Sequence, residues 1–479
     1  MAVQEKRSTR LGTAEVSRGR ALALLGTAWV MVTLDSTIVL TAVPSMQRDL
    51  PFSGTDVQWV VTAYALTFGG LMLLGGRMAD LLGRRRVFMG GVALFVLASL
   101  GCGLAWSPGS VVTLRAIQGL AAAVMAPTAL SLVMSIFPEG PARNRALGVW
   151  GGLGGVGAIA GLLVGGLMTA VAGWRWIFFL NIPIGILLFS FSRMVLPRYP
   201  RGKGDMDLAG AVAVTVGMLL LVYAVVQVPD TGWSSNQTLG LLTASVASLA
   251  LFVAIERKAI SPLLPLRVLT LRTVVGGNFV ILLAGMGLHG VLFPLTLYGQ
   301  QVRGWSALEF GLVGSAMMVS GIAGAWGAQA LVTRTSVRLV ASIGMGLIGV
   351  GAFTLSSATA QTAGVGWIVA GLAVFGPGLN AAFVSSQISA LTGVGEEEAG
   401  LASGMVDTSF NLGGALGVAV VTTIAVSGGV SLANGGADLP ISGDIAHVGY
   451  RSAFNAVVWF ALTGLLAAST ILRSRKGAR

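Results

Sequence analysis

The chain has 479 residues, of which 54% are hydrophobic and 10% are charged, and its formal net charge is +12 at pH 7. Soluble domains carry about 25% charged residues, so this composition excludes an ordinary globular protein and indicates an integral membrane protein. One cysteine, Cys102, excludes an intramolecular disulfide and a cysteine metal cluster. With only two histidines, a histidine-rich metal site is not expected either.

Fourteen apolar runs, each long enough to cross a bilayer, follow one another along the chain. We expect 14 transmembrane helices in an all-α integral membrane fold, and the even number predicts that both termini lie on the same side. In chain order the runs cover residues 21–43, 57–76, 87–105, 110–135, 146–170, 176–195, 208–228, 238–255, 273–296, 308–332, 337–357, 365–391, 399–427 and 452–472.

The basic residues favour one side of the membrane. Twenty-five of the 30 Lys and Arg residues lie in the two terminal segments, in every second loop between the runs, or within three residues of such a loop. Cytoplasmic loops of membrane proteins are enriched in Lys and Arg, so this pattern predicts that both termini are cytoplasmic. The net charge of +12 then forms a rim facing anionic lipid rather than a nucleic-acid-binding surface.

Two polar segments, 198–207 and 256–267, divide the runs into groups of six, two and six. This grouping predicts two six-helix bundles with an inserted two-helix hairpin, as in transporters built from repeated halves. The expected parts are a cytoplasmic N-terminus (1–20), a first bundle (21–200), the insertion (201–258), a second bundle (259–473) and a cytoplasmic tail (474–479).

Two opposite charges lie inside the apolar runs, where an isolated charge is costly. Asp35 lies about 21 Å along the first run and Arg115 about 8 Å along the fourth, by the helical rise per residue. The two runs cross a core of about 30 Å in opposite directions, so both side chains have a similar depth. We expect them to interact, directly or through water. The alternative to a proton-exchanging pair is a static structural ion pair.

Asp407, in the thirteenth run, is a second carboxylate inside the membrane. It is expected to carry a second proton or to contact a cationic substrate, and a hydrogen bond that only packs two helices is the alternative interpretation. Other polar side chains in the runs are candidates to line a substrate cavity, although a lone histidine is more often a packing residue. These candidates are Tyr64, Gln118, Asn278, His289 and Asn411.

The loop after the second run reads GGRMADLLGRRR and predicts a conformational latch. Gly76 and Gly83 permit a tight turn and close helix contact. Asp80 can accept hydrogen bonds from helix N-terminal amides, and Arg84 and Arg85 can bridge to the neighbouring domain. Such a latch would hold one conformation and break in the other. Topogenic basic residues on an inner loop are the alternative interpretation.

This loop resembles the signature loop of the major facilitator superfamily, and other motifs follow in order. LDSTIVLTAVP (34–44) and RAIQGLAAAVMAP (115–127) resemble motifs of spans 1 and 4 in the fourteen-span drug:proton antiporters of that superfamily. GAIAGLLVGG (157–166) resembles the antiporter motif of span 5. WRWIFFLNIPIG (174–185) and GLASGMVDTSFNLGGALGVA (400–419) resemble parts of spans 6 and 13. The resemblance covers residues 20–472.

The resemblance implies a secondary active transporter, not an enzyme, that exports hydrophobic or cationic drugs and antibiotics by alternating access. Proton coupling would involve Asp35, Arg115 and Asp407, and no cofactor is needed because the proton gradient drives transport. The partners implied are protons, a small amphiphilic substrate and the lipid of a bacterial cytoplasmic membrane. No nucleic acid is expected to bind, and a monomer is expected.

Two positions depart from the family pattern: Leu40 stands where the first-span motif usually has Asn, and Leu162 replaces the proline of the antiporter motif. The missing proline leaves open an exporter or symporter of a specific metabolite on the same fold. A membrane enzyme is not favoured, because the chain has no H-E-x-x-H or G-x-S-x-G motif. Close helix packing is still expected around the glycines of the motif, which are Gly157, Gly161, Gly165 and Gly166.

Overall fold

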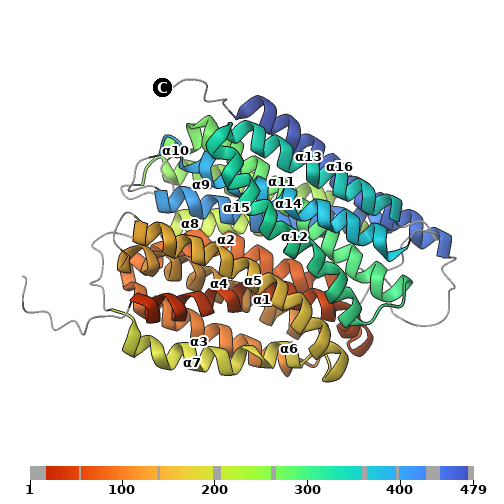
Figure 1. Cartoon of the computed structure of the whole chain (residues 1–479), viewed down its shortest axis with the longest axis horizontal. Coiled ribbons are helices and arrows are strands. Elements are labelled where there is room, and N and C mark those ends of the chain that lie inside the picture. The colour runs from red at the N-terminus through yellow and green to blue at the C-terminus, as the bar shows by residue number, and fades with distance from the viewer. Residues whose placement is uncertain are drawn as a thin grey trace, which may run out of the picture.

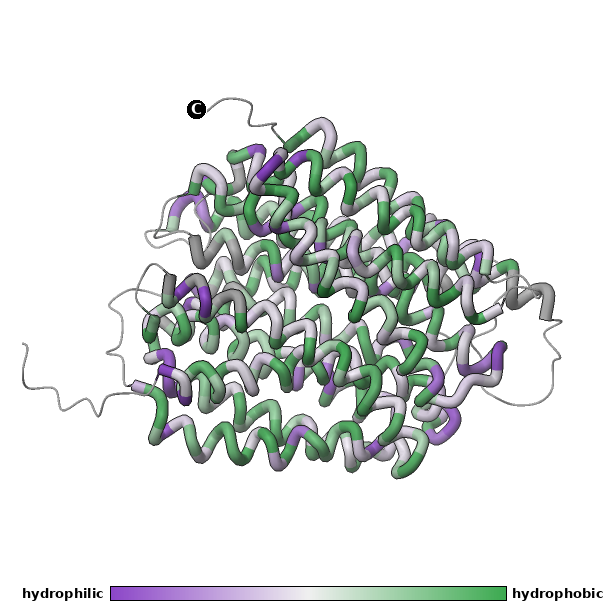
Figure 2. The backbone as a smooth tube through the Cα atoms, in the orientation of Figure 1, coloured by the Kyte–Doolittle hydropathy of each residue, from purple (hydrophilic) through white to green (hydrophobic). Residues whose placement is uncertain are grey.

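The computed structural model describes residues 18–52, 56–137, 141–197, 207–259, 266–358, 364–394, 399–427 and 443–472. Within these ranges the regular structure is helical throughout. Thirteen of the helices described there are long and apolar enough to cross a membrane, and α2 is a further apolar helix of 24 residues. Figure 2 shows that apolar residues predominate along the helices and that most hydrophilic residues lie near the helix ends. The chain is therefore a multi-pass membrane protein.

Two helical bundles form the molecule, one from each half of the chain (Figure 1). The first bundle contains α1 (Arg18–Asp49), α2 (Trp59–Leu82), α3 (Arg84–Gly103), α4 (Pro108–Ile136), α5 (Pro141–Val171), α6 (Trp176–Phe179) and α7 (Asn181–Val195). The second contains α11 (Arg272–Leu297), α12 (Ala307–Arg334), α13 (Val337–Ala358), α14 (Val365–Leu391), α15 (Ala399–Ser427) and α16 (Gly443–Ile471). The short helices η1 (Asp56–Gln58), α10 (Leu266–Thr270) and the π-helical η2 (Tyr298–Val302) precede or follow longer ones.

A helical hairpin, α8 (Leu208–Thr231) and α9 (Asn236–Glu256), connects the bundles in the sequence. Its two helices pack together through Ser245, whose hydroxyl donates to the carbonyl oxygen of Gly217 over 2.7 Å. Val222 and Val226 of α8 pack in one apolar cluster with Ala65 of α2 and Ala415 of α15. The hairpin therefore rests against both bundles.

The described ends of the chain, near Arg18 and Ile471, lie at the same end of the helices (Figure 1). The turn between α2 and α3 also lies there and carries Arg84 and Arg85. We call this end the basic end and the other the opposite end. Local signals fix several helix starts: Ser107 and Ser306, for example, each form a capping box at the start of α4 and α12.

Helices within a bundle approach each other through glycine. A Cβ atom on Gly75 of α2 would lie 2.1 Å from the carbonyl oxygen of Ala123 in α4, and one on Gly119 would lie 2.4 Å from that of Tyr64. No larger residue fits at such a backbone contact. The 69 glycines of the chain are thus compatible with a membrane bundle, in which small residues allow close helix packing.

The two bundles contact each other toward the opposite end. The amide of Gln300 in η2 donates to the carbonyl oxygen of Thr41 in α1 over 3.0 Å, and that of Gln301 donates to Gln47 over 2.9 Å. In the same region a Cβ atom on Gly311 of α12 would lie 2.4 Å from the carbonyl oxygen of Leu162 in α5. These contacts close the opposite end between the bundles.

Predicted and observed helix bounds agree best where polar loops flank an apolar run. The predicted runs 365–391 and 399–427 coincide with α14 and α15. The prediction was too short for α16, which begins at Gly443 rather than at residue 452, and for α1, which continues to Asp49. Hydropathy reports only the apolar part of a helix, whereas backbone hydrogen bonds continue through its polar ends.

Candidate functional site

Asp35 of α1 and Arg115 of α4 form a direct ion pair inside the first bundle. The Nη1 atom of Arg115 lies 2.6 Å from Oδ2 of Asp35. The two side chains are 1% and 0% exposed, respectively. The sequence places these two residues at a similar depth in the membrane and so predicts that they interact, and the structure shows them in direct contact. In an apolar interior such a pair offsets the cost of burying each charge.

Two amides complete the surroundings of the Asp35 carboxylate. Gln118 and Asn181 each donate to its Oδ1 atom, over 2.9 and 2.8 Å. Gln118 also accepts from Nη1 of Arg115 over 2.7 Å and donates to the hydroxyl of Ser99 over 2.8 Å. With the arginine, three donors thus hold one buried carboxylate, and charge-assisted bonds of this kind are among the stronger ones.

The guanidinium of Arg115 has two further partners. Its Nε atom donates to the carbonyl oxygen of Val60 over 3.0 Å. Its carbon lies 4.2 Å from the ring centroid of Tyr64, within the range of a cation–π interaction. The Tyr64 hydroxyl in turn donates to the carbonyl oxygen of Val32 over 3.4 Å. The cation is therefore held in place by groups that would remain if Asp35 became neutral.

Five helices bring these residues together. Asp35 comes from α1, Tyr64 from α2, Ser99 from α3 and Asn181 from the first turn of α7. Arg115 and Gln118 are three residues apart on α4, a spacing that places two side chains on the same face of a helix. Each of these side chains is at most 2% exposed. We call Asp35, Arg115, Gln118 and Asn181 the buried polar cluster.

Asn181 also has an oxygen that no hydrogen bond uses. Its Oδ1 atom is buried and has no partner among the described residues. An unpaired buried acceptor costs free energy, so its presence needs an explanation. It lies on the same amide group that donates to Asp35. A rotation of that amide about its terminal bond would present the oxygen to the carboxyl group instead.

Sequence reasoning missed two members of this site. Asn181 lies within the motif WRWIFFLNIPIG, which resembles part of span 6 in the family, but the motif alone does not indicate a role for this residue. Ser99 gave no signal, because an isolated serine is common in an apolar helix. Tyr64 and Gln118 were expected as candidates to line a substrate cavity. They are instead 2% and 0% exposed and contact the ion pair.

Asp407 lies in the second bundle, apart from the buried polar cluster. Its side chain on α15 is half-buried, and its backbone carbonyl accepts a hydrogen bond from Asn411 over 2.8 Å. Asn411, on the same face of α15, lies against α2. A Cβ atom built on Gly69 of α2 would be 2.8 Å from the Cβ atom of Asn411. Asp407 therefore belongs to the side of α15 that is turned toward the first bundle.

Two further cavity candidates, His289 and Asn278, lie on α11 where it packs against α15. The ring of His289 packs edge-on against Phe410, with 6.2 Å between the ring centroids. The amide oxygen of Asn278 accepts from the hydroxyl of Ser409 over 2.8 Å. His289, Asn278 and Asn411 are all half-buried. Asn411 and Asp407 thus lie on the side of α15 toward α2, whereas His289 and Asn278 lie at the contact between α11 and α15.

The predicted latch residues have contacts within the first bundle. Arg84 donates to the backbone carbonyl of Ser131 over 3.4 Å and to the hydroxyl of Ser135. Arg85 donates to the carbonyl oxygen of Leu196 over 3.1 Å. These contacts lie within the first bundle, and a bridge from the two arginines to the neighbouring domain stays a prediction. The side chain of Asp80 lies outside the described residues.

The glycines of the latch and of the antiporter motif differ in what they contact. Gly83 has a φ of 96° at the turn between α2 and α3, a conformation that favours glycine. No atom lies within 4 Å of a Cβ atom built on Gly76. By contrast, a Cβ atom built on any of the four antiporter-motif glycines of α5 would lie too close to a neighbouring helix. Such Cβ atoms would contact α1 at Gly157, Gly161 and Gly165, and α12 at Gly166.

Comparison with known proteins identifies the family. Residues 25–418 match the family described as the Major Facilitator Superfamily. The chain is 40% identical over 416 residues to the cephamycin export protein CmcT of Amycolatopsis lactamdurans, covering 85% of each chain. It is 37% identical to the MFS-type transporter EfpA of Mycobacterium tuberculosis, over 85% of this chain and 77% of that one. It is 35% identical to the puromycin resistance protein pur8 of Streptomyces alboniger, over 95% and 91%.

Solved structures show the same fold at low sequence identity. A bacterial homolog of the human lysosomal transporter Spinster superimposes with a TM-score of 0.68, covering 96% of this chain and 98% of that one at 15% identity. The nucleoside transporter NupG gives a TM-score of 0.65 at 14% identity, covering 95% and 100%. The family match over residues 25–418 and the relatives at 35–40% identity show that the chain belongs to the major facilitator superfamily, and it is a membrane transporter rather than an enzyme. The resemblance found in its motifs is confirmed.

Proposed function

We propose that this transporter exports hydrophobic or cationic drugs and antibiotics across a bacterial cytoplasmic membrane in exchange for protons. The observation that carries the proposal is the buried polar cluster, in which one carboxylate and one arginine are paired inside an apolar bundle. Relatives named for cephamycin export and for puromycin resistance support the choice of substrate class. The proton gradient supplies the energy, so the proposal requires no cofactor.

Asp35 is the proton carrier in this proposal. Ionised, it accepts from Arg115, Gln118 and Asn181. When a proton binds, the carboxyl group becomes a donor, and rotation of the Asn181 amide would place its unused Oδ1 atom to accept that bond. Arg115 loses its counter-charge but keeps its contacts with Val60 and Tyr64. The rotated amide therefore supplies an acceptor for the new O–H donor, and its own NH2 group then turns to the place that the unpaired oxygen had occupied.

Substrate binding is assigned to the space between the bundles, where transporters of this architecture hold their substrates. Asp407 would attract a cationic group from the second bundle, and it is the candidate for a second proton. The ring of Phe410, together with His289, offers an aromatic surface beside it. Apolar surroundings with one carboxylate favour amphiphilic cations.

Alternating access follows from where the bundles meet. The contacts of Gln300 with Thr41 and of Gly311 with Leu162 close the opposite end, which supports entry of the substrate from the basic end. Release would require these contacts to break while the bundles approach each other at the basic end. The loop from Gly76 to Arg85 would act as the latch in that second state.

The proposed membrane arrangement has fourteen spans: the thirteen apolar helices given above and α2. Helices α8 and α9 form the inserted hairpin. The position of the hairpin against α2 and α15 supports this assignment. The basic end is cytoplasmic by the positive-inside rule, so both termini are cytoplasmic. The transporter is proposed to act as a monomer with the two bundles at residues 21–200 and 259–473.

Leu162 bears on the second candidate, a transporter for one specific metabolite. In this chain Leu162 lies in the contact that closes the opposite end: its carbonyl oxygen faces Gly311, and its Cδ1 atom would lie 3.2 Å from a Cβ atom on Gly314. The leucine side chain fills space that a proline ring would fill only in part. This close packing supports a sealed exporter.

Substrate-induced proton movement in proteoliposomes tests the proposal. A pH gradient is imposed, a panel of lipophilic cations and neutral antibiotics is added, and wild type is compared with Asp35→Asn. We expect at least one compound to move protons through wild type and none through the variant. The matched control is Asp49→Asn, which removes an exposed carboxylate at the opposite end that pairs with Arg175. A wild-type protein that responds only to one narrow metabolite would support the second candidate.

A further inference from the structure

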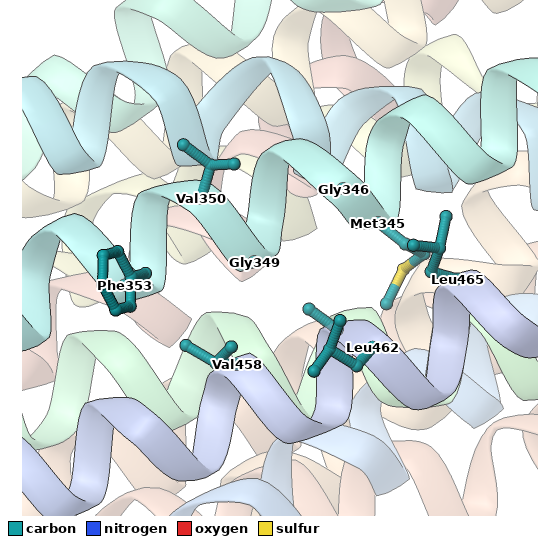
Figure 3. Close-up of a pocket in the computed structure, with 9 residues that line it drawn as sticks. Met345, Gly346, Gly349, Val350, Phe353, Val458, Leu462 and Leu465 are labelled. Atoms are coloured by element: carbon teal, nitrogen blue, oxygen red, sulfur yellow. The ribbon is translucent and has the colours of Figure 1, made fainter.

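An apolar groove lies between α13 and α16, away from the contact between the bundles. Its volume is about 350 Å³, and its walls include Met345, Phe353, Val458 and Leu465. Figure 3 shows the two helices running side by side, with Phe353 near Val458 at one end of the groove and Met345 near Leu465 at the other. The nine residues that line it carry apolar side chains or none.

Glycine creates this groove. Gly346 and Gly349 lie along its α13 wall. No atom lies within 4 Å of a Cβ atom built on Gly346, whereas one on Gly349 would be 3.3 Å from the side chain of Ala461. Missing side chains on α13 thus leave a trough that α16 does not fill. A side chain added at position 346 would project into free space.

The groove opens toward the lipid. Phe353 is 62% exposed and Leu462 is 41% exposed, and both line it. In a helix that crosses a bilayer, such exposed apolar side chains face hydrocarbon. Water has no hydrogen-bonding partners among these side chains, so it is a poor occupant. A hydrocarbon chain matches the lining.

Polar groups lie beyond one end of the groove. Arg451 precedes Val458 by seven residues on α16, which places it on the same helix face about 10 Å nearer the opposite end. Ser357 follows Phe353 by four residues on α13, again on the same face and toward the same end. Both side chains are exposed. The apolar trough therefore leads toward one cation and one hydroxyl near the membrane surface.

We propose that this groove binds an anionic phospholipid of the leaflet at the opposite end. One acyl chain lies along Gly346, Gly349 and Leu462, and the phosphate contacts Arg451. A basic residue near the surface attracts anionic lipid, so the site would favour phosphatidylglycerol over phosphatidylcholine by about fivefold. A second copy of the chain fits less well, because a two-fold symmetric contact centred on this groove would bring two copies of Arg451 together.

Native mass spectrometry of the detergent-purified protein tests the site. Wild type is incubated with mixed vesicles of phosphatidylglycerol and phosphatidylcholine, and the lipids retained are counted. We expect one retained lipid with the stated preference for phosphatidylglycerol. Arg451→Gln should remove the preference while still retaining a lipid. Gly346→Leu, which fills the trough, should abolish retention of both lipids.

Two further variants keep the result interpretable. Gly90→Leu adds the same side chain at an exposed glycine of α3 that also has no atom within 4 Å of its Cβ position, and it should retain lipid as wild type does. Leu462→Trp fills the trough from α16 and should lose lipid even if Gly346→Leu fails to fold. Unchanged retention in either filled variant overturns the proposal. A dimer that dissociates on filling would assign the groove to a second copy and also overturn it.

Discussion

Gly311 of α12 lies directly against the backbone of Leu162 in α5, with room for a hydrogen atom but not for a methyl group. The two residues belong to different bundles and sit in the contact that closes the opposite end. Leu162 is the residue that replaces the antiporter-motif proline. The close approach of α12 to α5 at this end therefore requires glycine at position 311.

Substituting Gly311 should open that end. In Gly311→Leu the new side chain would collide with α5, because its Cβ atom alone would lie 2.4 Å from a carbonyl oxygen. We expect the population that is open at the opposite end to increase. Double electron–electron resonance measures this in a Cys102→Ala background with spin labels at Leu104 and Val365, which are exposed residues near that end.

The control for this experiment lies on the same helix. Gly327 of α12 is exposed and has no atom within 4 Å of a Cβ position, so Gly327→Leu should leave the distance distribution as in wild type. If Gly311→Leu is folded and its distances match those of wild type, then the close approach of α12 to α5 does not set the conformation.

The Asp35–Arg115 pair should show strong energetic coupling. Asp35→Asn leaves a buried guanidinium without its counter-charge, and breaking a buried ion pair in this way costs roughly 3–5 kcal/mol in other proteins. The double variant Asp35→Asn/Arg115→Gln removes both charges, so it should be more stable than either single variant. Thermal unfolding in detergent gives the comparison, and the double variant should still lack proton-coupled transport.

Asp49→Asn serves as the stability control. Asp49 pairs with Arg175 over 3.5 Å, and the two side chains are 52% and 42% exposed. An exposed pair contributes only about 0–1 kcal/mol, so little change is expected. Additive losses in the Asp35 and Arg115 variants would show that the two charges do not depend on each other.

Asp407 should affect cationic and neutral substrates differently. Asp407→Asn removes a half-buried carboxylate from the side of α15 that faces α2. We expect the affinity for a lipophilic cation to fall about tenfold, equivalent to roughly 1.4 kcal/mol, whereas the affinity for a neutral hydrophobic antibiotic should stay the same. Equilibrium binding of radiolabelled compounds measures both. An equal loss for the two classes would indicate a structural role for Asp407.

Two adjacent glycines of the signature loop should respond in opposite ways. Gly75→Ala forces a Cβ atom to within 2.1 Å of the Ala123 carbonyl oxygen, whereas Gly76→Ala meets no atom within 4 Å. The first variant should therefore lose thermal stability. The second should keep it, because alanine is a better helix former than glycine, and yet lose transport if the latch closes on position 76 in the other conformation.

Transport assays in proteoliposomes and melting curves on the same preparations separate these effects. A Gly76→Ala variant with wild-type stability and wild-type transport would refute the latch. A Gly75→Ala variant as stable as wild type would contradict the close packing of α2 on α4.

The sequence predicted those features that have a large energetic signature. Apolar runs define helices because burying backbone in lipid requires a complete set of internal hydrogen bonds. Asp35 and Arg115 could be paired from depth alone, because opposite charges in an apolar medium have few other ways to lower their cost.

Features of smaller energetic weight could not be predicted. Asn181 and Ser99 are neutral, and nothing in the spacing along the chain says that α3 and α7 bring them to Asp35. The burial of Tyr64 and Gln118 depends on how four helices pack. Likewise, the groove beside Gly346 arises from two helices that are about 100 residues apart in the sequence, and a glycine alone gives no sign of it.

The buried polar cluster also has an electrical consequence. With Asp35 ionised, the carboxylate and the guanidinium together carry no net charge, so moving the first bundle through the membrane field does no electrical work on them. With Asp35 protonated, the bundle carries the unbalanced charge of Arg115. Moving one elementary charge fully across a membrane potential of 100 mV changes its energy by about 2.3 kcal/mol. The potential would therefore drive the proton-loaded movement of the cluster and do no work on the cluster during its return.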